Sequence, residues 1–174
     1  MSQIKVNSIV PLAGLSGGAS GGVLQTKSAF KTDTASFTTL NSATDPYFFL
    51  ETTITPVSTS SKILIFAYIT VGSSGGTTYR FQVNRGTTPV LRGDTGDASE
   101  SRATSGTNTQ ETWEVANIAT MNIDSPASTS ELTYKLGISN GTSGYTAYIN
   151  RSSTDGGAEY VRGTSGFILQ EVSG

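Results

Sequence analysis

Carboxylates on two glycine-containing segments are the side chains whose type and spacing come closest to a chemical site. Asp94 and Asp97 stand three positions apart with Glu100 nearby, and Asp155 and Glu159 border a second segment of this kind. Paired carboxylate oxygens suit a hard cation such as calcium. Their spacing does not match the longer EF-hand loop, so we interpret both segments as solvated turns.

Histidine and cysteine are both absent. Histidine is the commonest general base and zinc ligand, and cysteine supplies disulfides and thiolate metal ligands. A glycoside hydrolase needs two carboxyl groups about 5 to 10 Å apart, one of them with a raised pKa. Glu51, Asp124 and Glu171 fall at strand ends or near turns, where we expect solvated side chains. The sequence therefore predicts no enzyme activity, no cofactor and no metal site.

Aromatic residues in the second half of the chain offer another chemistry. Trp113, Tyr145, Tyr148 and Tyr160 could stack against sugar rings, because each ring system joins an apolar face to a polar edge. Packing in the core or at a subunit axis is the alternative, and for any single one of these residues we prefer it.

The composition indicates a β-rich chain. Of the 174 residues, 35% are hydrophobic and 14% charged, with a net charge of −2. Disorder usually combines low hydrophobicity with high net charge, so the small net charge favours a β fold rich in Ser and Thr. A pI near 5.0 without a basic cluster argues against a nucleic-acid partner. The longest apolar run, Ile63–Tyr68, is far short of the about 20 residues that span a bilayer, and no signal-peptide pattern is present, so we expect no membrane insertion.

Short strands separated by turn signals follow one another from residue 23 onward, which is typical of β-sandwiches and jelly rolls. Tyr79, Phe81 and Val83 alternate with polar residues, which predicts a half-buried strand. We expect strands over Val23–Lys31, Ala35–Leu40, Tyr47–Ile54, Lys62–Val71, Tyr79–Arg85, Pro89–Arg92, Thr133–Ile138, Tyr145–Asn150, Tyr160–Arg162 and Ser165–Val172.

Several details of the pattern predict how these strands pack. Lys62–Val71 has apolar residues at both its odd-numbered and its even-numbered positions, which predicts a central strand covered on both faces. Gly93–Gln110 is polar and dotted with glycine, so we expect an exposed loop with one weak strand. The pair Asn140-Gly141 predicts a hairpin between its flanking strands. A further set of apolar residues is expected to join the core: Trp113, Val115, Ile118, Met121 and Ile123.

Residues 1–22 differ from the rest of the chain. A short apolar stretch is followed by a Gly/Ser connector over 14–22, which predicts a flexible link. Apolar side chains gain nothing in a free tail, so we predict that Ile4, Val6, Ile9, Val10 and Leu12 dock on another protein; a frayed terminus is the alternative. The predicted organisation is an extended N-terminal arm with its linker over 1–22 and a β-sandwich domain over 23–174.

The opening run Gln3–Pro11 with its Gly/Ser connector resembles the N-termini of virion structural and tail-fibre proteins of marine and freshwater bacteriophages, cyanophages especially. A domain that recurs in those proteins is similar to this chain at Leu24–Lys27, Lys31–Thr34, Ile54–Leu64, Asp124–Pro126, Thr133–Leu136, Tyr148–Arg151 and Leu169–Val172. The resemblance covers nearly the whole chain. It implies an all-β, antiparallel β-sandwich of the jelly-roll, tumour-necrosis-factor-like class that assembles as a homotrimer on the particle.

A non-enzymatic virion protein is therefore the expected function: a homotrimeric tail fibre or surface appendage of the phage particle, made in the host cytoplasm. Its arm would bind a tail adaptor or a capsid protein. Asp94, Asp97, Arg102, Asp155 and Glu159 would lie on exposed loops that face a host surface glycan or protein. The chain has no long repetitive shaft, so a capsid decoration (cement) protein that stabilises the head is an alternative. A polysaccharide depolymerase is a remote one, because such tailspikes usually carry a long β-solenoid.

Overall fold

The computed structural model describes residues 22–38, 46–90, 92–94, 102–141 and 144–174, and this part of the chain folds into strands without a helix. The expected all-β fold is therefore confirmed. The predicted arm, with Ile4, Val6, Ile9, Val10 and Leu12, lies outside the described residues. The strands are β1 (Val23–Lys31), β2 (Ala35–Phe37), β3 (Tyr47–Ile54), β4 (Lys62–Ser73), β5 (Thr77–Arg85), β6 (Thr88–Val90), β7 (Ser105–Thr109), β8 (Val115–Asp124), β9 (Leu132–Asn140), β10 (Ala147–Ile149) and β11 (Ser165–Val172).

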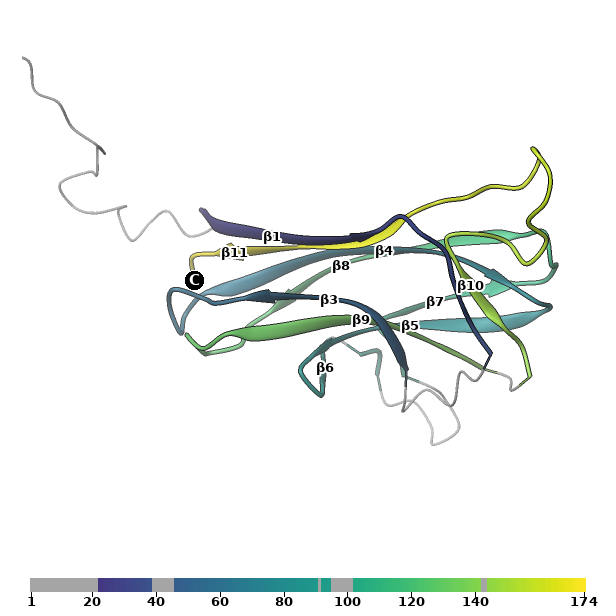
Figure 1. The fold of residues 1–174 in the computed structure, drawn as a ribbon. Coiled ribbons are helices and arrows are strands. Elements are labelled where there is room, and N and C mark those ends of the chain that lie inside the picture. Colours follow the sequence, from purple (N-terminus) through teal and green to yellow (C-terminus); the bar gives the residue numbers. More distant parts are fainter. Residues whose placement is uncertain (1–21, 39–45, 91, 95–101, 142–143) are drawn as a thin grey trace, which may run out of the picture.

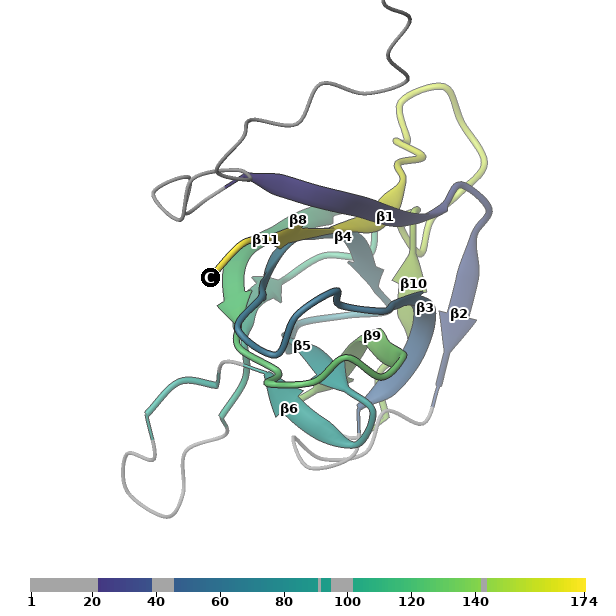
Figure 2. The same cartoon turned by 90° about the vertical axis from the view of Figure 1, so that its left-hand side faces the viewer.

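Two antiparallel sheets face each other as a β-sandwich (Figure 1). The long strand β4 organises the first sheet: β8 pairs along one edge of it, and β11 and then β10 pair in succession along the other. Outside these, β1 pairs with β11 and β2 with β10. The second sheet has the order β3-β9-β5, with β7 and β6 following one another along the outer edge of β5. Viewed from the end, the two sheets curl around a common interior (Figure 2).

Alternation of apolar and polar residues decides which side of each strand enters the core. Tyr79, Phe81 and Val83 on β5 are all 0% exposed, as predicted from their spacing. The facing sheet contributes the odd-numbered apolar residues of β4, and β9 and β11 complete the interior. The members of these three strands in the core are Ile63, Ile65, Ala67, Ile69, Val71, Tyr134, Leu136, Ile138, Phe167 and Leu169.

Three packing predictions are wrong. The single chain leaves the outward face of β4 open in the first half of the strand, where Phe66 is 36% exposed, whereas Thr70 further along the same face is buried. Of the apolar set expected in the core, Ile118 is buried, whereas Trp113, Met121 and Ile123 are 58%, 70% and 52% exposed. The strands on either side of Asn140-Gly141 do not form a hairpin, since β9 belongs to the second sheet and β10 pairs with β4 and β2 in the first.

Strand positions were predicted more accurately than strand pairing. The weak strand expected within Gly93–Gln110 exists as β7. The strand expected over Tyr160–Arg162 is reduced to an isolated bridge between Arg151 and Arg162. Within the described ranges, no helix is long and apolar enough to cross a membrane.

Buried polar residues fasten the two sheets at the end near the C-terminus. Asp124 of β8 accepts hydrogen bonds from Arg85 of β5 at 2.6 Å and from the hydroxyl of Tyr134 of β9 at 2.7 Å, so it joins the sheets. Burial, followed by the neighbouring carboxylate, raises the pKa of Tyr134, so its hydroxyl keeps its proton. Glu171 of β11 is 0% exposed and accepts from the Gln25 amide at 2.6 Å and from the backbone N–H of Val57 at 2.7 Å. The expectation that Asp124 and Glu171 are solvated is therefore wrong.

Asn150 fastens the other end of the first sheet. Its side-chain amide donates to the backbone oxygens of Lys31 and Asp33, at 2.9 and 2.8 Å, and its oxygen accepts from the Ser165 hydroxyl at 2.6 Å. The residue is 0% exposed and has a φ of 65°, a left-handed conformation that asparagine tolerates better than most residues. One side chain thus holds β10, β11 and the β1–β2 turn together.

Candidate assembly surface

The outward side of the first sheet is apolar over four adjacent strands. In an antiparallel sheet, residues directly opposite each other point to the same face. On this side Leu64 lies opposite Ile123, and Phe66 lies opposite both Met121 and Ile168. We call this surface the apolar face, and it consists of Thr26, Ser28 and Phe30 on β1, Gly166, Ile168 and Gln170 on β11, Leu64, Phe66 and Tyr68 on β4, and Ala119, Met121 and Ile123 on β8.

Large side chains on the apolar face meet solvent in the isolated chain. Phe30 is 54% exposed, Met121 70%, Ile123 52% and Phe66 36%. Single exposed apolar residues are ordinary, but a contiguous group of this kind usually marks a surface that another molecule covers. The exposed residues of the apolar face adjoin one another across β1, β11, β4 and β8, so they form a contiguous group and are not single exposed residues.

The apolar face contains no Asp, Glu, Lys or Arg among its described residues. Lys62 borders it at the end of β4 nearest the C-terminus. Such a face can be removed from water without leaving a charge unpaired, which is the main cost of covering a protein surface.

Close packing fixes the Phe30 ring on this surface. A Cβ placed on Gly166, which lies opposite Phe30, would collide with the ring and would come within 2.9 Å of the backbone oxygen of Ala29. Glycine at position 166 therefore lets the aromatic ring lie flat across β11. The ring extends the apolar face to the outer strand of the sheet.

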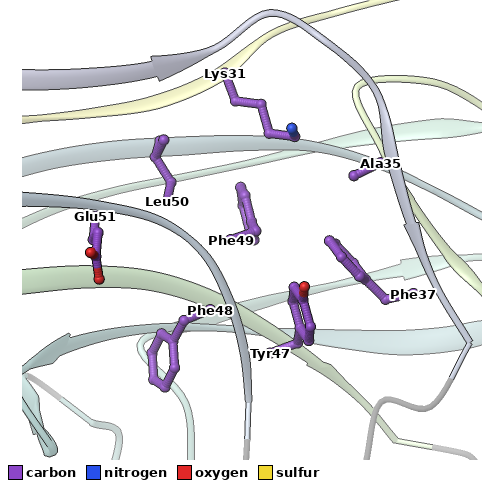
Figure 3. Close-up of a pocket in the computed structure, with 8 residues that line it drawn as sticks. All are labelled: Lys31, Ala35, Phe37, Tyr47, Phe48, Phe49, Leu50 and Glu51. Atoms are coloured by element: carbon purple, nitrogen blue, oxygen red, sulfur yellow. The ribbon is translucent and has the colours of Figure 1, made fainter.

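A second apolar feature is a hollow at the side of the sandwich, between β2 and β3. Its volume is about 430 Å³. The rings of Phe37 and Tyr47 stack there with centroids 3.9 Å apart, and Phe49 lies 6.4 Å from Phe37 (Figure 3). Lys31 and Glu51 also line the hollow. The connection from β2 to β3, residues 39–45, lies outside the described residues, and we assign the hollow no ligand.

The predicted host-facing residues divide into two groups. Asp94 and Arg102 lie beside the second sheet, where the Nε of Arg102 donates to the backbone oxygen of Gly93 at 2.8 Å. Together with Arg80 they line an open hollow of about 410 Å³. Asp97 lies outside the described residues, as does Glu100, so the proposed oxygen ligands of this loop are not assembled in the described part.

Asp155 and Glu159 lie on the long connection between β10 and β11. The carboxylate of Asp155 accepts two hydrogen bonds from Arg162, at 3.0 and 2.7 Å, and the guanidinium of Arg151 is 3.9 Å away. Arg162 holds the pKa of Asp155 below its usual value. The side chain of Glu159 folds back against Gly157.

These two groups do not form one site. Figure 2 shows the connection between β10 and β11 on the opposite side of the sandwich from the segment around residues 92–94. Of the four aromatic residues considered for sugar stacking, Trp113 is 58% exposed, while Tyr145, Tyr148 and Tyr160 are half-buried. The Arg151 guanidinium lies 4.2 Å above the Tyr148 ring. In the described residues, no group of three or more acidic side chains is placed to hold a metal ion.

Reasoning from the sequence missed the apolar face, although a signal for it exists. Ile118 and Met121 are three positions apart, and two such residues of one regular strand point to opposite sides. They cannot both enter the same core. Alternate residues of a strand point to the same side. A second apolar surface is therefore indicated by Ala119, Met121 and Ile123 on one strand and by Leu64, Phe66 and Tyr68 on another.

Comparison of the chain with protein-family models gives no match. Comparison with curated proteins gives no match either.

Proposed function

We propose that this chain is a non-enzymatic structural protein of a bacteriophage particle, a homotrimeric tail fibre or surface appendage held by its N-terminal arm. The observation that supports this best is the apolar face, because it is large enough to cross four strands and carries no charge in its described residues. The resemblance of the sequence to phage tail-fibre and virion proteins supplies the setting.

The strand order supports a jelly roll as the finer fold class. Eight strands, β1, β3, β4, β5, β7, β8, β9 and β11, are numbered here from one to eight. The first sheet then has the order 1-8-3-6 and the second has the order 2-7-4-5. The first and last strands thus lie side by side, and the chain crosses between the sheets at every step except from β5 to β7, as in two interlocked Greek keys. The arrangement agrees with the class that the sequence resemblance implies.

A copy of the same chain is the partner that suits the apolar face. Identical copies present identical charges, so a charged face repels its own copy unless the pattern is complementary. The apolar face avoids this problem, and burying Phe66, Met121 and Ile123 against a second copy stabilises the assembly by removing apolar area from water. Covering this side would also give β4 the two covered faces that its sequence predicts.

The non-enzymatic part of the proposal rests on what three hydrogen-bonded carboxylates do. Asp124 bridges two sheets, Glu171 holds β1 and the turn before β4 to β11, and Asp155 is paired with two arginines. Each of these carboxylates accepts hydrogen bonds from other segments and thereby holds those segments together. These are structural roles.

Electron microscopy of phage particles with the protein labelled tests the position on the particle. Label confined to the tail or to projecting appendages is expected. Label scattered over the head would contradict the fibre assignment and favour capsid decoration, in which the same trimer reinforces the shell. Incubation of the purified protein with host envelope polysaccharide is expected to release no new reducing ends, and their appearance would contradict the non-enzymatic assignment.

A further inference from the structure

Trp113 is the single tryptophan of the chain, and it is held out into solvent by a fixed turn. The carboxylate of Glu114 accepts hydrogen bonds from the backbone N–H groups of Gln110 and Glu111, at 2.6 and 3.1 Å, and the N–H of Glu114 donates back to the Glu111 oxygen at 3.3 Å. An aromatic side chain on a fixed turn loses little conformational entropy when it binds a ligand. This makes Trp113 a suitable anchor for binding.

A polar loop lies directly beside this turn. The N–H of Thr154 donates to the backbone oxygen of Thr112 at 3.0 Å, and the hydroxyls of the two threonines are 3.3 Å apart. Trp113 and Asp155 are the next residues after this bonded pair on their two segments. From Asp155 onward the loop surrounds an open hollow of about 490 Å³, lined by Asp155, Gly156, Gly157, Ala158, Tyr160 and Arg162.

The charges of this loop compensate each other. Arg151 and Arg162 carry two positive charges and Asp155 and Glu159 two negative ones, and the Asp155 carboxylate is bonded to Arg162. The adjoining turn adds the carboxylates of Glu111 and Glu114, so an anionic ligand would meet no attractive net charge at this site. A neutral ligand with many hydroxyl groups fits better, because paired Asp and Arg side chains offer both acceptors and donors at fixed positions.

We propose that Trp113 and the loop from Asp155 to Arg162 form a binding site for a neutral carbohydrate, with the apolar face of a sugar ring against the indole and its hydroxyls on Asp155 and Arg162. This inference rests on the proposed function, because the site lies at the end of the sandwich opposite Val23, where the arm begins (Figure 1). In a particle held by the arm, that end projects outward.

The test uses the full chain on a printed array of bacterial surface oligosaccharides, followed by a fluorescence titration of each oligosaccharide that is retained. Because Trp113 is the single tryptophan, its emission reports on this site alone. At least one neutral oligosaccharide should bind and shift the emission to shorter wavelength. The variants are measured by isothermal titration calorimetry, which needs no tryptophan signal, and Trp113→Ala should weaken binding roughly tenfold or more because it removes the stacking surface. Tyr47→Ala, which removes an aromatic ring that is 48% exposed on β3, is the matched control and should bind as the parent does.

The outcomes separate this proposal from the proposed function. Absence of binding to every glycan, or unchanged affinity in Trp113→Ala, overturns the carbohydrate site while the trimer assignment stands. Loss of the trimer in Trp113→Ala also overturns it, because Trp113 would then be a subunit contact. Glycan binding by a protein that is monomeric would support the site and contradict the proposed assembly.

Discussion

Phe66 of β4 and Met121 of β8 lie directly opposite each other on the outward side of the first sheet, where the two side chains are 36% and 70% exposed. Cross-strand pairs of this kind normally stabilise a sheet by covering each other. Ile168 of β11 lies opposite Phe66 on its other side, so three strands contribute to one uncharged surface. The account of assembly depends on this surface being covered by other copies of the chain.

Met121→Glu should dissociate the assembly without unfolding the chain. A carboxylate at this position would be buried without a partner between subunits, which should lower the association constant by at least roughly two orders of magnitude. The isolated fold should lose no more than about 0.5 kcal/mol, because Met121 is 70% exposed in the single chain. Light scattering coupled to size-exclusion chromatography measures the mass, and circular dichroism during thermal unfolding measures the fold.

Thr53→Glu is the matched control for that variant. Thr53 is exposed on β3 of the opposite sheet, so the same new charge there should leave the mass unchanged. If both variants dissociate, net charge and not the apolar face controls assembly. An intact assembly in Met121→Glu would show that the face is not a subunit contact.

Glu171 should make the stability of the fold depend on pH in the acid range. Burial alone raises the pKa of Glu171, but the Ser61 hydroxyl, the Gln25 amide and the N–H of Val57 lie against the carboxylate and hold its pKa below the usual value. The unfolded chain therefore takes up the proton first as pH falls. This contribution is fully present above the pKa of an ordinary glutamate, about 4.3, and is lost as pH falls through the lower pKa of the folded state.

Glu171→Gln tests that assignment. The substituted amide would bring its own N–H donors toward the donors of Gln25 and Val57, which should cost about 1 to 3 kcal/mol at neutral pH. The free energy of unfolding, measured with urea between about pH 3 and pH 7, should fall less steeply toward acid pH in the variant. The difference should correspond to roughly one titrating group. Parallel curves for the two proteins would rule out Glu171 as the group responsible.

Asn150→Asp should destabilise the fold although the two side chains have nearly the same size. The amide that donates to the oxygens of Lys31 and Asp33 would be replaced by an oxygen that repels them, inside a fully buried site. We expect a loss of roughly 2 to 4 kcal/mol in the free energy of unfolding, measured with urea. Asn150→Gly keeps the φ of 65° without strain and introduces no repulsion, so it should be less harmful than Asn150→Asp. The reverse order would contradict the assigned hydrogen bonds.

Deletion of residues 1–22 should separate assembly from attachment. The described strands begin at Val23, and the apolar face uses none of the deleted residues, so the truncated chain should fold and give the same mass as the full chain. It should fail to enter phage particles in a complementation experiment. Incorporation at the normal level would show that the arm is not the attachment segment.

The sequence predicts most strands correctly because their side-chain alternation is a local property. Tyr79, Phe81 and Val83 on β5 enter the core as their spacing indicates. The failure at Asn140-Gly141 has a physical reason: a turn dipeptide fixes a local bend but cannot decide whether the next strand pairs with its predecessor or crosses to the other sheet. The strand β10 instead pairs with β4, and Asn150 at its end donates its backbone N–H to the Thr70 oxygen of β4, which is far away in the sequence.

The candidate sites were harder to predict, because exposure depends on how strands are paired. Met121 and Trp113 are apolar and were expected in the core; the spacing of Ile118 and Met121 shows that one of the two points outward, and the register of β8 against β4 shows that it is Met121. Glu171 failed in the opposite direction. It is charged and close to the chain end, and its burial is compensated by hydrogen bonds from Gln25 and Val57 on other segments. A prediction from residue type alone therefore failed both for the exposed apolar side chains and for the buried carboxylate.

The mass of the unmodified full chain in solution tests the central claim most directly. Light scattering at micromolar concentration should give about three times the 18.1 kDa of one chain. A stable mass of one chain at that concentration would contradict assembly through the apolar face.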